Sequence, residues 1–399
     1  MLSLSLLALA QDTNLPPLAA VQNNNVWLFG FADAPQQITD GTARGYSDLV
    51  WSSDGSYLAF IARDQDYNAN LMLYDRASNT LTKVENDIAD GFPVGFSFDS
   101  SQLFYVKDDP DNGTGPDYRM DFYTYDLAPN ATPTQVASFA FGVGCGGGSP
   151  FPGDWRYTAE TGGLGGFHLV LEVTPFGLVH SMDCGGSQTG LLNLQTGEDV
   201  SLGQMSRAAV SADRTKVAGI VDLAGTRTNE KLVVVDLESR ARTELETAGT
   251  PDQVAWAAQG SSELFYSTRD VTDRKLALTA EEVERIHTVF GESSLENVLE
   301  VSIHHFDLET GADTELYHSE AYAIGRMIPR DSTLLFSQVA SAEAWIRAIG
   351  MGELDMSDPE KYDQSISLTP LELFSLPLNG GEAELIGADL SQIALYPAQ

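Results

Sequence analysis

Short apolar runs and polar turns alternate along the whole chain, and one arrangement of them returns five times. An apolar residue precedes a short polar turn that carries Asp, Gly or Ser, and a second apolar run follows. The copies are WSSDGSYLAF (51–60), FSFDSSQLFY (96–105), VSADRTKVAG (210–219), WAAQGSSELFY (256–266) and IPRDSTLLFS (328–337). Asp-Gly between alternating apolar positions is a strong hairpin signal, because the tight turn needs residues that tolerate positive φ. Five copies predict a repeating unit that begins with a β-hairpin.

A second pattern, typical of strand, polar turn and strand, follows these copies. It occurs at LYDRASNTLTKV (73–84), YTYDLAPNATPTQV (123–136), LLNLQTGEDVSL (191–202), VVVDLESRARTEL (233–245), IHHFDLETGADTEL (303–316) and LFSLPLNGGEAELI (373–386). A seventh copy, VWLFGFADAPQQIT (26–39), has no first pattern ahead of it, and FHLVLEVTPFGLVHSM (167–182) replaces the blurred first pattern between 142 and 190. Each unit therefore has four strands, as in one blade of a β-propeller.

The two ends of the chain complete each other. The segment LAAVQNNNVWLFGF with the following QQIT predicts three strands, and SQIALYP (391–397) predicts one more. Pairing the last strand with the first three gives a seventh blade and removes the exposed edges of an open sheet. We therefore predict an all-β fold, a seven-bladed β-propeller of four-stranded antiparallel blades, as a single domain over residues 11–399.

The stretch WSSDGSYLAFIARDQDYNANLMLYDRASNTLTKV (51–84) resembles the WD-like repeats of TolB-type β-propellers. In those repeats an Asp-Gly turn precedes an apolar-Ala-Phe strand, and a later strand ends in Tyr-x-x-Asp. The resemblance extends over nearly all of residues 20–399 and implies the fold. It does not imply one function, because such propellers serve as binding scaffolds, as sugar or peptide handlers, and as gates fused to hydrolases.

The long insertions are expected on one face of the disk. Segments 63–70, 108–120, 223–230, 269–299 and 340–369 connect the second and third strands of their blades, and 141–165 connects two blades. In an antiparallel blade these connections leave from the same face. Loops longer than about a dozen residues are usually functional or disordered.

Two of these insertions, 269–299 and 340–369, are predicted to contain short helices. In LTAEEVERIHTVFGE (278–292), Thr279 and Glu282 form a capping box, and SAEAWIRAIGMGELDM (341–356) starts at Ser341. The apolar side chains of these helices are either packed on the rim of the propeller or exposed as anchors for a partner. The candidate anchors of this binding face are Trp345, Ile346, Ile349 and Phe290.

The charge of the chain restricts its partners. There are 22 Lys and Arg against 57 Asp and Glu, which gives a net charge of −35. This balance opposes binding to nucleic acid, where basic side chains must neutralise phosphates, and docking on anionic lipid. No segment after the start is apolar enough to insert in a membrane. A protein, peptide or glycan remains as the predicted partner.

The N-terminus and the cysteines indicate export. The stretch from Leu2 to Ala10 is apolar and ends in Ala-Leu-Ala, the pattern that a signal peptidase accepts, so we interpret residues 1–10 as a signal-peptide remnant. The alternative is a frayed apolar N-terminus. The predicted location is secreted, extracellular or periplasmic. Cys145 and Cys184 have neither zinc-site nor C-x-x-C spacing. In an exported protein one disulfide between them is expected, and two free buried thiols are the alternative.

Catalytic motifs are not found in the sequence. It contains no G-x-S-x-G elbow, P-loop, dinucleotide fingerprint or H-E-x-x-H, so we assign no catalytic or cofactor-binding residue. Acidic loops are the one ligand-like signal, and calcium is the cation that their oxygens would bind. The candidate ligands are Asp64, Asp66, Asn68, Asp109 and Asp111. The alternative is a pair of solvated hairpin tips that use Asx turns.

These observations favour a secreted, non-enzymatic propeller that binds a protein, peptide or glycan through its loop-covered face. The first alternative is a polysaccharide-directed lyase or hydrolase with a metal-assisted site at the mouth of the channel. The second is a structural subunit of a cell-surface assembly. Two or more His or acidic side chains with metal-like geometry at the channel mouth would favour the enzyme.

Overall fold

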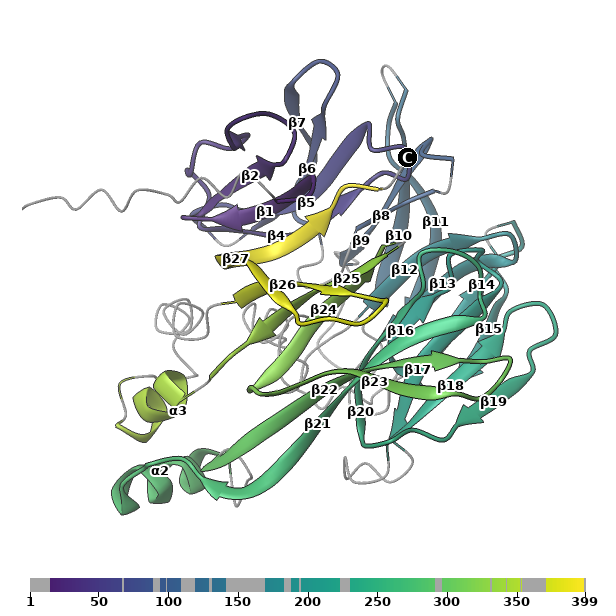
Figure 1. Ribbon diagram of the computed structural model, residues 1–399. Coiled ribbons are helices and arrows are strands. Elements are labelled where there is room, and N and C mark those ends of the chain that lie inside the picture. Colours follow the sequence, from purple (N-terminus) through teal and green to yellow (C-terminus); the bar gives the residue numbers. More distant parts are fainter. Residues whose placement is uncertain are drawn as a thin grey trace, which may run out of the picture.

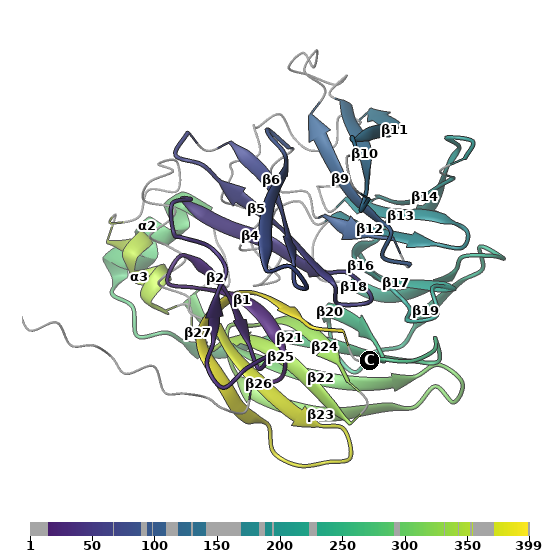
Figure 2. The same ribbon diagram turned by 90° about the horizontal axis from the view of Figure 1, so that it is seen from above.

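Seven four-stranded antiparallel blades surround a central axis in the computed structural model (Figures 1 and 2). The structure describes residues 15–397 except for 67, 89–93, 98, 109–118, 129–130, 141–168, 183–187, 194, 223–229, 291–295, 331, 342, 352 and 354–370. The predicted blade number and strand count are confirmed.

Within a blade the strands follow chain order from the axis outward (Figure 2). The first three blades consist of β4 (Gly45–Trp51), β5 (Tyr57–Arg63), β6 (Ala69–Asp75) and β7 (Thr80–Glu85); β8 (Gly95–Phe96), β9 (Gln102–Asp108), β10 (Arg119–Asp126) and β11 (Thr134–Ala140); and β12 (Leu169–Thr174), β13 (Gly177–Met182), β14 (Gln188–Leu192) and β15 (Asp199–Gly203). The next three consist of β16 (Ser206–Val210), β17 (Lys216–Asp222), β18 (Glu230–Asp236) and β19 (Arg242–Leu245); β20 (Pro251–Trp256), β21 (Glu263–Lys275), β22 (Asn297–Asp307) and β23 (Asp313–Glu320); and β24 (Ala323–Pro329), β25 (Thr333–Val339), β26 (Leu371–Pro377) and β27 (Glu384–Leu395).

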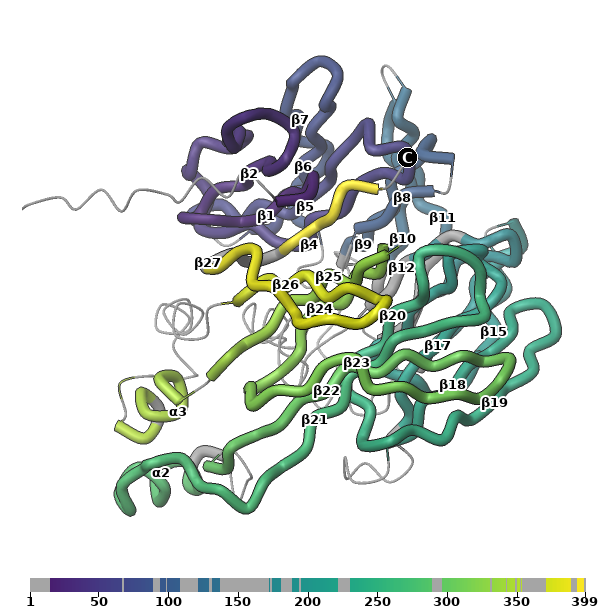
Figure 3. The backbone as a smooth tube through the Cα atoms, in the orientation of Figure 1, coloured from purple at the N-terminus to yellow at the C-terminus, as the bar shows by residue number. Residues whose placement is uncertain are grey.

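Both ends of the chain build the seventh blade. It consists of the end of β27 followed by β1 (Leu18–Gln22), β2 (Asn25–Phe29) and β3 (Gln36–Gln37). The pairs Leu18↔Leu395 and Ala19↔Ala394 join the two termini, as predicted. Figure 3 shows the yellow C-terminal strand beside the purple N-terminal one. Backbone hydrogen bonds between the first and last strands therefore close the ring.

One detail of this closure differs from the sequence prediction. We expected a fourth strand of blade 6 near 386 and a separate strand over 391–397, but β27 is continuous and belongs to both blades. Its first part pairs with β26, and its last residues pair with β1. Register shifts in the two ladders absorb the change of blade, so the chain needs no turn there.

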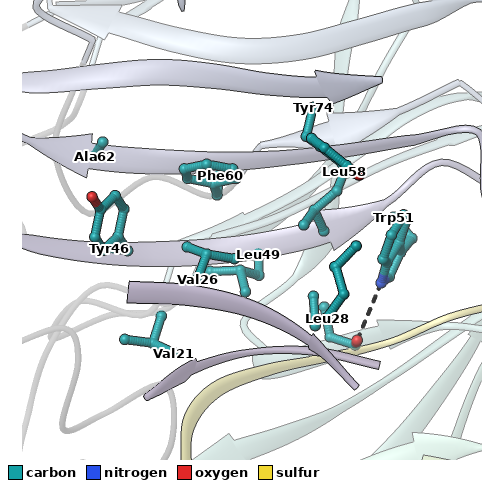
Figure 4. Close-up of a cluster of buried hydrophobic side chains, with 12 residues drawn as sticks. Val21, Val26, Leu28, Tyr46, Leu49, Trp51, Leu58, Phe60, Ala62 and Tyr74 are labelled. Carbon is teal, nitrogen blue, oxygen red and sulfur yellow. Dashed lines mark hydrogen bonds between the residues drawn. The ribbon is translucent and has the colours of Figure 1, made fainter. Parts of the chain in front are cut away.

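The core is divided among the interfaces between neighbouring blades. Between blades 7 and 1, for example, the buried cluster contains Val26, Leu28, Leu58 and Phe60 (Figure 4). Comparable clusters lie between blades 3 and 4, 4 and 5, and 5 and 6. Successive side chains of a strand point to opposite faces of its blade, and each face packs against an adjacent blade. Both faces of a blade are therefore apolar.

The recurring Trp of the first pattern ties one blade to the preceding one. Trp51 donates from Nε1 to the carbonyl of Ala394 at 3.2 Å, which is the dashed line in Figure 4. Trp256 donates in the same way to the carbonyl of Ala209 at 2.8 Å. In both cases the ring lies at the end of an innermost strand, so its apolar body fills the interface while its N–H binds backbone.

The recurring Asp makes the turn itself. Asp54 Oδ1 accepts from Ser52 Oγ at 2.7 Å and from the backbone N–H of Ser56 at 3.0 Å. The turns Ser97-x-Asp99-x-Ser101 and Ser211-x-Asp213-x-Thr215 repeat these bonds. We call the side of the disk with these hairpins the turn face. The Ser and Thr partners named here all lie within two residues of the Asp, so most of this turn chemistry is local.

Candidate functional site

The opposite side of the disk, which we call the loop face, carries the long connections. The connection from β21 to β22 contains α2 (Ala280–Phe290), and the connection from β25 to β26 contains α3 (Glu343–Gly350). Figures 1 and 2 both place α3 beside α2, at the tip of the extended β21–β22 hairpin. We refer to the two helices together as the platform. The predicted helices and their position on this face are confirmed.

Each helix begins at the cap that the sequence indicated. The backbone N–H of Thr279 donates to Glu282 Oε2 at 2.6 Å, and the N–H of Glu282 donates to Thr279 Oγ1 at 3.3 Å. These reciprocal bonds form a capping box. At α3, the N–H of Glu343 donates to Ser341 Oγ at 3.1 Å. The local sequence therefore sets where both helices start.

Tertiary packing joins the helices to blades 5 and 6. Ile286 of α2 and Trp345 of α3 lie in one buried cluster. It also contains Tyr322 and Ala323, which lie where β24 of blade 6 begins. Leu299 of β22 packs against the same cluster. The platform thus has a core of its own that rests on two different blades, and neither helix could bury its apolar face without the other elements.

An arginine fixes the contact between the helices. Arg347 of α3 donates to Glu343 Oε1 at 2.7 Å and to Glu282 Oε1 of α2 at 3.1 Å, and it also reaches the carbonyl of Ala277. Hydrogen bonds from Thr279, above all its backbone N–H, hold the pKa of the Glu282 carboxyl below its ordinary value, and the nearby guanidinium lowers it further. Glu282 is therefore ionised at neutral pH and serves as cap and ion-pair partner together.

The structure corrects the prediction that the platform residues are exposed anchors. Trp345 and Ile346 are only 1% and 2% exposed, because α2 and the start of blade 6 cover them. No partner can touch them unless the helices move. The side chains of Ile349 and Phe290 lie outside the described set. Of the described apolar side chains near the platform, Val271 on β21 and Met351 after α3 are exposed instead.

The proposed calcium loops are only partly described. Asp64 accepts from the N–H groups of Asp66 and Asn68 through Oδ1 at 2.9 and 3.0 Å, so this loop is closed by its own hydrogen bonds. Asp109 and Asp111 lie outside the described residues. Within the residues that are described, no three His, Cys, Asp or Glu side chains are placed to hold a metal ion. The calcium site stays a prediction.

The adjacent histidines diverge, as their positions in one strand require. His304 lies 3.1 Å from Asp313, measured from Nδ1 to Oδ1, and His305 lies 3.1 Å from Glu263, measured from Nε2 to Oε2.

Cys145 and Cys184 fall outside the described residues, so their pairing stays a prediction. No described helix is long and apolar enough to cross a membrane.

The innermost strands carry a feature that the sequence patterns did not reveal. In five of the seven blades the first strand has one residue more than its partner, which makes a β-bulge next to the axis. Four of the bulges contain a charged residue: Asp48, Arg207, Asp252 and Arg326. Asp48 and Arg207 also have φ of +54° and +51°, a strained conformation for residues other than glycine. Bulges of this kind re-aim side chains and are common beside functional sites.

Both of these arginines form hydrogen bonds with the next blade. Arg207 of blade 4 binds Asp252 Oδ1 of blade 5 at 2.6 Å, and Arg326 of blade 6 donates to the carbonyl of Ile393 in blade 7 at 3.0 Å. Glu172 of blade 3 faces the same region. Its Oε2 lies 4.0 Å from Nη1 of Arg214, and its side chain is 41% exposed. A charged residue three or four positions before the end of the first strand was the signal available in the sequence.

Comparison with known proteins gives a fold and no closer assignment. No family model matches the chain, and no curated protein matches it. Among solved structures, a prolyl endopeptidase has 12% identity and a TM-score of 0.54, over 96% of this chain and 51% of that one. An oligogalacturonate lyase in complex with manganese has 12% identity and a TM-score of 0.51, over 78% and 79%. TolB from Acinetobacter baumannii has 11% identity and a TM-score of 0.43, over 96% and 66%.

The fold is a seven-bladed β-propeller, and TolB proteins are among its structural neighbours. The propeller fold that the resemblance implied is confirmed by the blades themselves. The chain spans about half the length of the prolyl endopeptidase and about two thirds of TolB. At these identities the likeness concerns the propeller only.

Proposed function

We propose that the chain is a non-enzymatic propeller that binds a protein, peptide or glycan partner through its loop face, beside the platform. The observation that carries the proposal is that the platform is assembled in advance. Its two helices come from different blades, share one buried core and are joined by Arg347. A surface that is ordered before binding loses less conformational entropy when a partner docks.

The ordering of the platform also requires a reason. Closing a blade needs only a short turn, and fixing each further residue costs roughly 1–2 kcal/mol of conformational entropy. Burial of Trp345, Ile346 and Ile286 offsets part of this cost. The exposed side chains of Val271 and Met351 add nothing to that burial, and they are available to a partner.

Photo-cross-linking tests the docking face. A benzophenone amino acid is placed at Met351 on the loop face or at Leu385 just after the β26–β27 turn on the turn face. The two side chains are matched, since each is 50% exposed. In cells that produce the protein, we expect discrete adducts from position 351 and none from 385. The same adducts from position 385, or none from 351, would contradict the proposal.

A second arm uses purified protein and arrays of peptides and glycans. Met351→Glu should abolish binding to the array component that the natural chain recognises, and Leu385→Glu should leave it unchanged. Both exchanges put a charge on an exposed position, so their effects on folding should be equally small. Equal loss in both variants would place the binding surface elsewhere.

We include in this proposal that the protein functions outside the cytoplasm. It rests on the apolar residues 1–10 and on the expected Cys145–Cys184 disulfide, which would constrain the unfolded chain. Alkylation of native protein followed by mass spectrometry tests this part. We expect no alkylated thiol before reduction and two after it.

A further inference from the structure

Three neighbouring polar side chains at the start of blade 5 are buried with an atom left unpartnered. The atoms are Asp252 Oδ2, Gln253 Nε2 and Ser267 Oγ, and none of them forms a hydrogen bond within the described residues. The three residues are 4%, 8% and 0% exposed. Gln253 and Ser267 lie directly opposite each other in the β20–β21 ladder, so their side chains share one face of the blade.

Such a group is uncommon in a folded protein. Buried donors and acceptors nearly always have partners, because burying one without a partner is costly. A single unpartnered hydroxyl would carry little weight. Three in adjacent positions, on a strand with a bulge at Asp252, indicate that a bound molecule completes the set.

The charges nearby restrict what that molecule is. Arg269 follows Ser267 by two positions on β21 and therefore faces the same side. Its Nη2 lies 4.0 Å from Asp252 Oδ1, an oxygen that Arg207 already binds at 2.6 Å. The charge of Arg269 is thus compensated only in part, although the chain as a whole has a net charge of −35. An anion is the ligand that this guanidinium favours.

The neutral groups distinguish between anions. A guanidinium, an amide N–H and a hydroxyl are donors for the two oxygens of a carboxylate. One partly compensated positive charge matches a monoanion better than a phosphate dianion. Asp252 Oδ2 needs a donor, which a carboxylate alone cannot provide but a neighbouring hydroxyl can.

We propose that blade 5 binds a small 2-hydroxy monocarboxylate at this site. Its carboxylate is held by Arg269, Gln253 and Ser267, and its hydroxyl donates to Asp252. Arg269 keeps 20% of its side chain exposed, so the site meets solvent at the guanidinium. This site is separate from the docking of a macromolecule at the platform, and either proposal can fail without the other.

Calorimetric titration of the full chain with glycolate tests the site. We expect saturable binding of glycolate, weaker binding of acetate, which lacks the hydroxyl, and no binding of glycolamide, which lacks the charge. Arg269→Gln should weaken glycolate binding by on the order of 10-fold or more, because it removes a charged hydrogen bond. Ser267→Ala should weaken it by about 5-fold.

Arg274→Gln is the matched control. Arg274 lies on the same strand, but its side chain is 54% exposed and pairs with Glu320 at 2.7 Å. The Arg274→Gln variant should bind glycolate with the same affinity as the natural chain. If Arg269→Gln fails to fold, as judged by circular dichroism, Ser267→Ala still decides the question.

Three results would overturn the proposal. One is the absence of saturable glycolate heat, with a crystal structure that shows only ordered water on the three atoms. Another is equal glycolate affinity of the natural chain and the Ser267→Ala variant. The third is tighter binding of inorganic phosphate than of glycolate, which would assign the site to a different anion.

Discussion

On the turn face, three blades close their first hairpin with the same Ser-x-Asp-x-Ser/Thr bonds, at Asp54, Asp99 and Asp213. On the loop face, the connections of blades 5 and 6 instead leave the sheet, form helices and pack on each other. The two faces are built from the same repeat, and they differ in where the stabilising contacts come from. The repeated turn bonds join residues two positions apart, whereas the platform depends on residues from separate blades.

This difference separates the contacts that close the ring from the contacts that hold the platform. The turn face also holds the terminal clasp, where Tyr396 stacks edge-on against Trp51 at 5.2 Å and against Phe31 at 4.9 Å between ring centroids. Gly55 is required there, because a Cβ on it would come within 2.3 Å of the Tyr396 ring. The platform contributes nothing to this clasp. Substitutions at the clasp should therefore change the stability of the whole ring, and substitutions in the platform should change mainly the local stability of α2 and α3.

The largest effect is expected from Trp51→Ala on the turn face. The exchange removes the clasp contacts with Tyr396 and the hydrogen bond to Ala394. A buried Trp exchanged for Ala costs about 3–5 kcal/mol. Because the clasp joins the first and last strands, the whole transition should move to lower denaturant, as measured by urea unfolding followed by circular dichroism. An unchanged midpoint would show that the termini do not contribute to closure.

A smaller global effect is expected from the same exchange on the other face. Trp345→Ala removes the largest side chain of the platform core, and the helices should undock while the blades stay paired. Hydrogen exchange should rise steeply in α2 and α3 and little in the strands. A fall of the global midpoint as large as that of Trp51→Ala would show that platform and ring unfold as one unit.

The smallest effect is expected from Asp213→Asn, and it should depend on pH. Burial opposes ionisation of Asp213, but hydrogen bonds from Ser211, Ser261 and Thr215 outweigh it and lower the pKa from 3.8 to about 2. A carboxyl with a lowered pKa stabilises the fold above its unfolded pKa, and the contribution is lost as pH falls toward 2. The variant should therefore be less stable than the natural chain at pH 7, with the gap narrowing between pH 4 and pH 2.

Urea titrations at several pH values measure this gap. Asp33→Asn, at an exposed position in the connection between β2 and β3, is the control that removes the same charge. A gap that stays constant from pH 7 to pH 2 would mean that the turn hydrogen bonds do not favour the ionised form of Asp213.

Much of the fold was predictable because its signals are local. The hairpin turns need only residues two positions apart, and the start of α2 needs only Thr279 and Glu282. The seven units and the pairing of the termini followed from counting strands. Here the periodicity of apolar residues and the turn chemistry point to the same structure.

The candidate sites depended on contacts that the sequence does not display. Burial of Trp345 requires Tyr322 and Ala323 from blade 6, so an apolar helix stripe alone did not reveal whether it faced solvent or core. The bulge at Arg207 is held by Asp252, 45 residues later, and the unpartnered atoms of Gln253 and Ser267 appear only when β20 and β21 pair. Local hydrogen bonds and periodicity therefore determined the blades from sequence alone. Only the closed ring decided which polar and apolar side chains are buried, because those side chains are covered by residues distant in the chain.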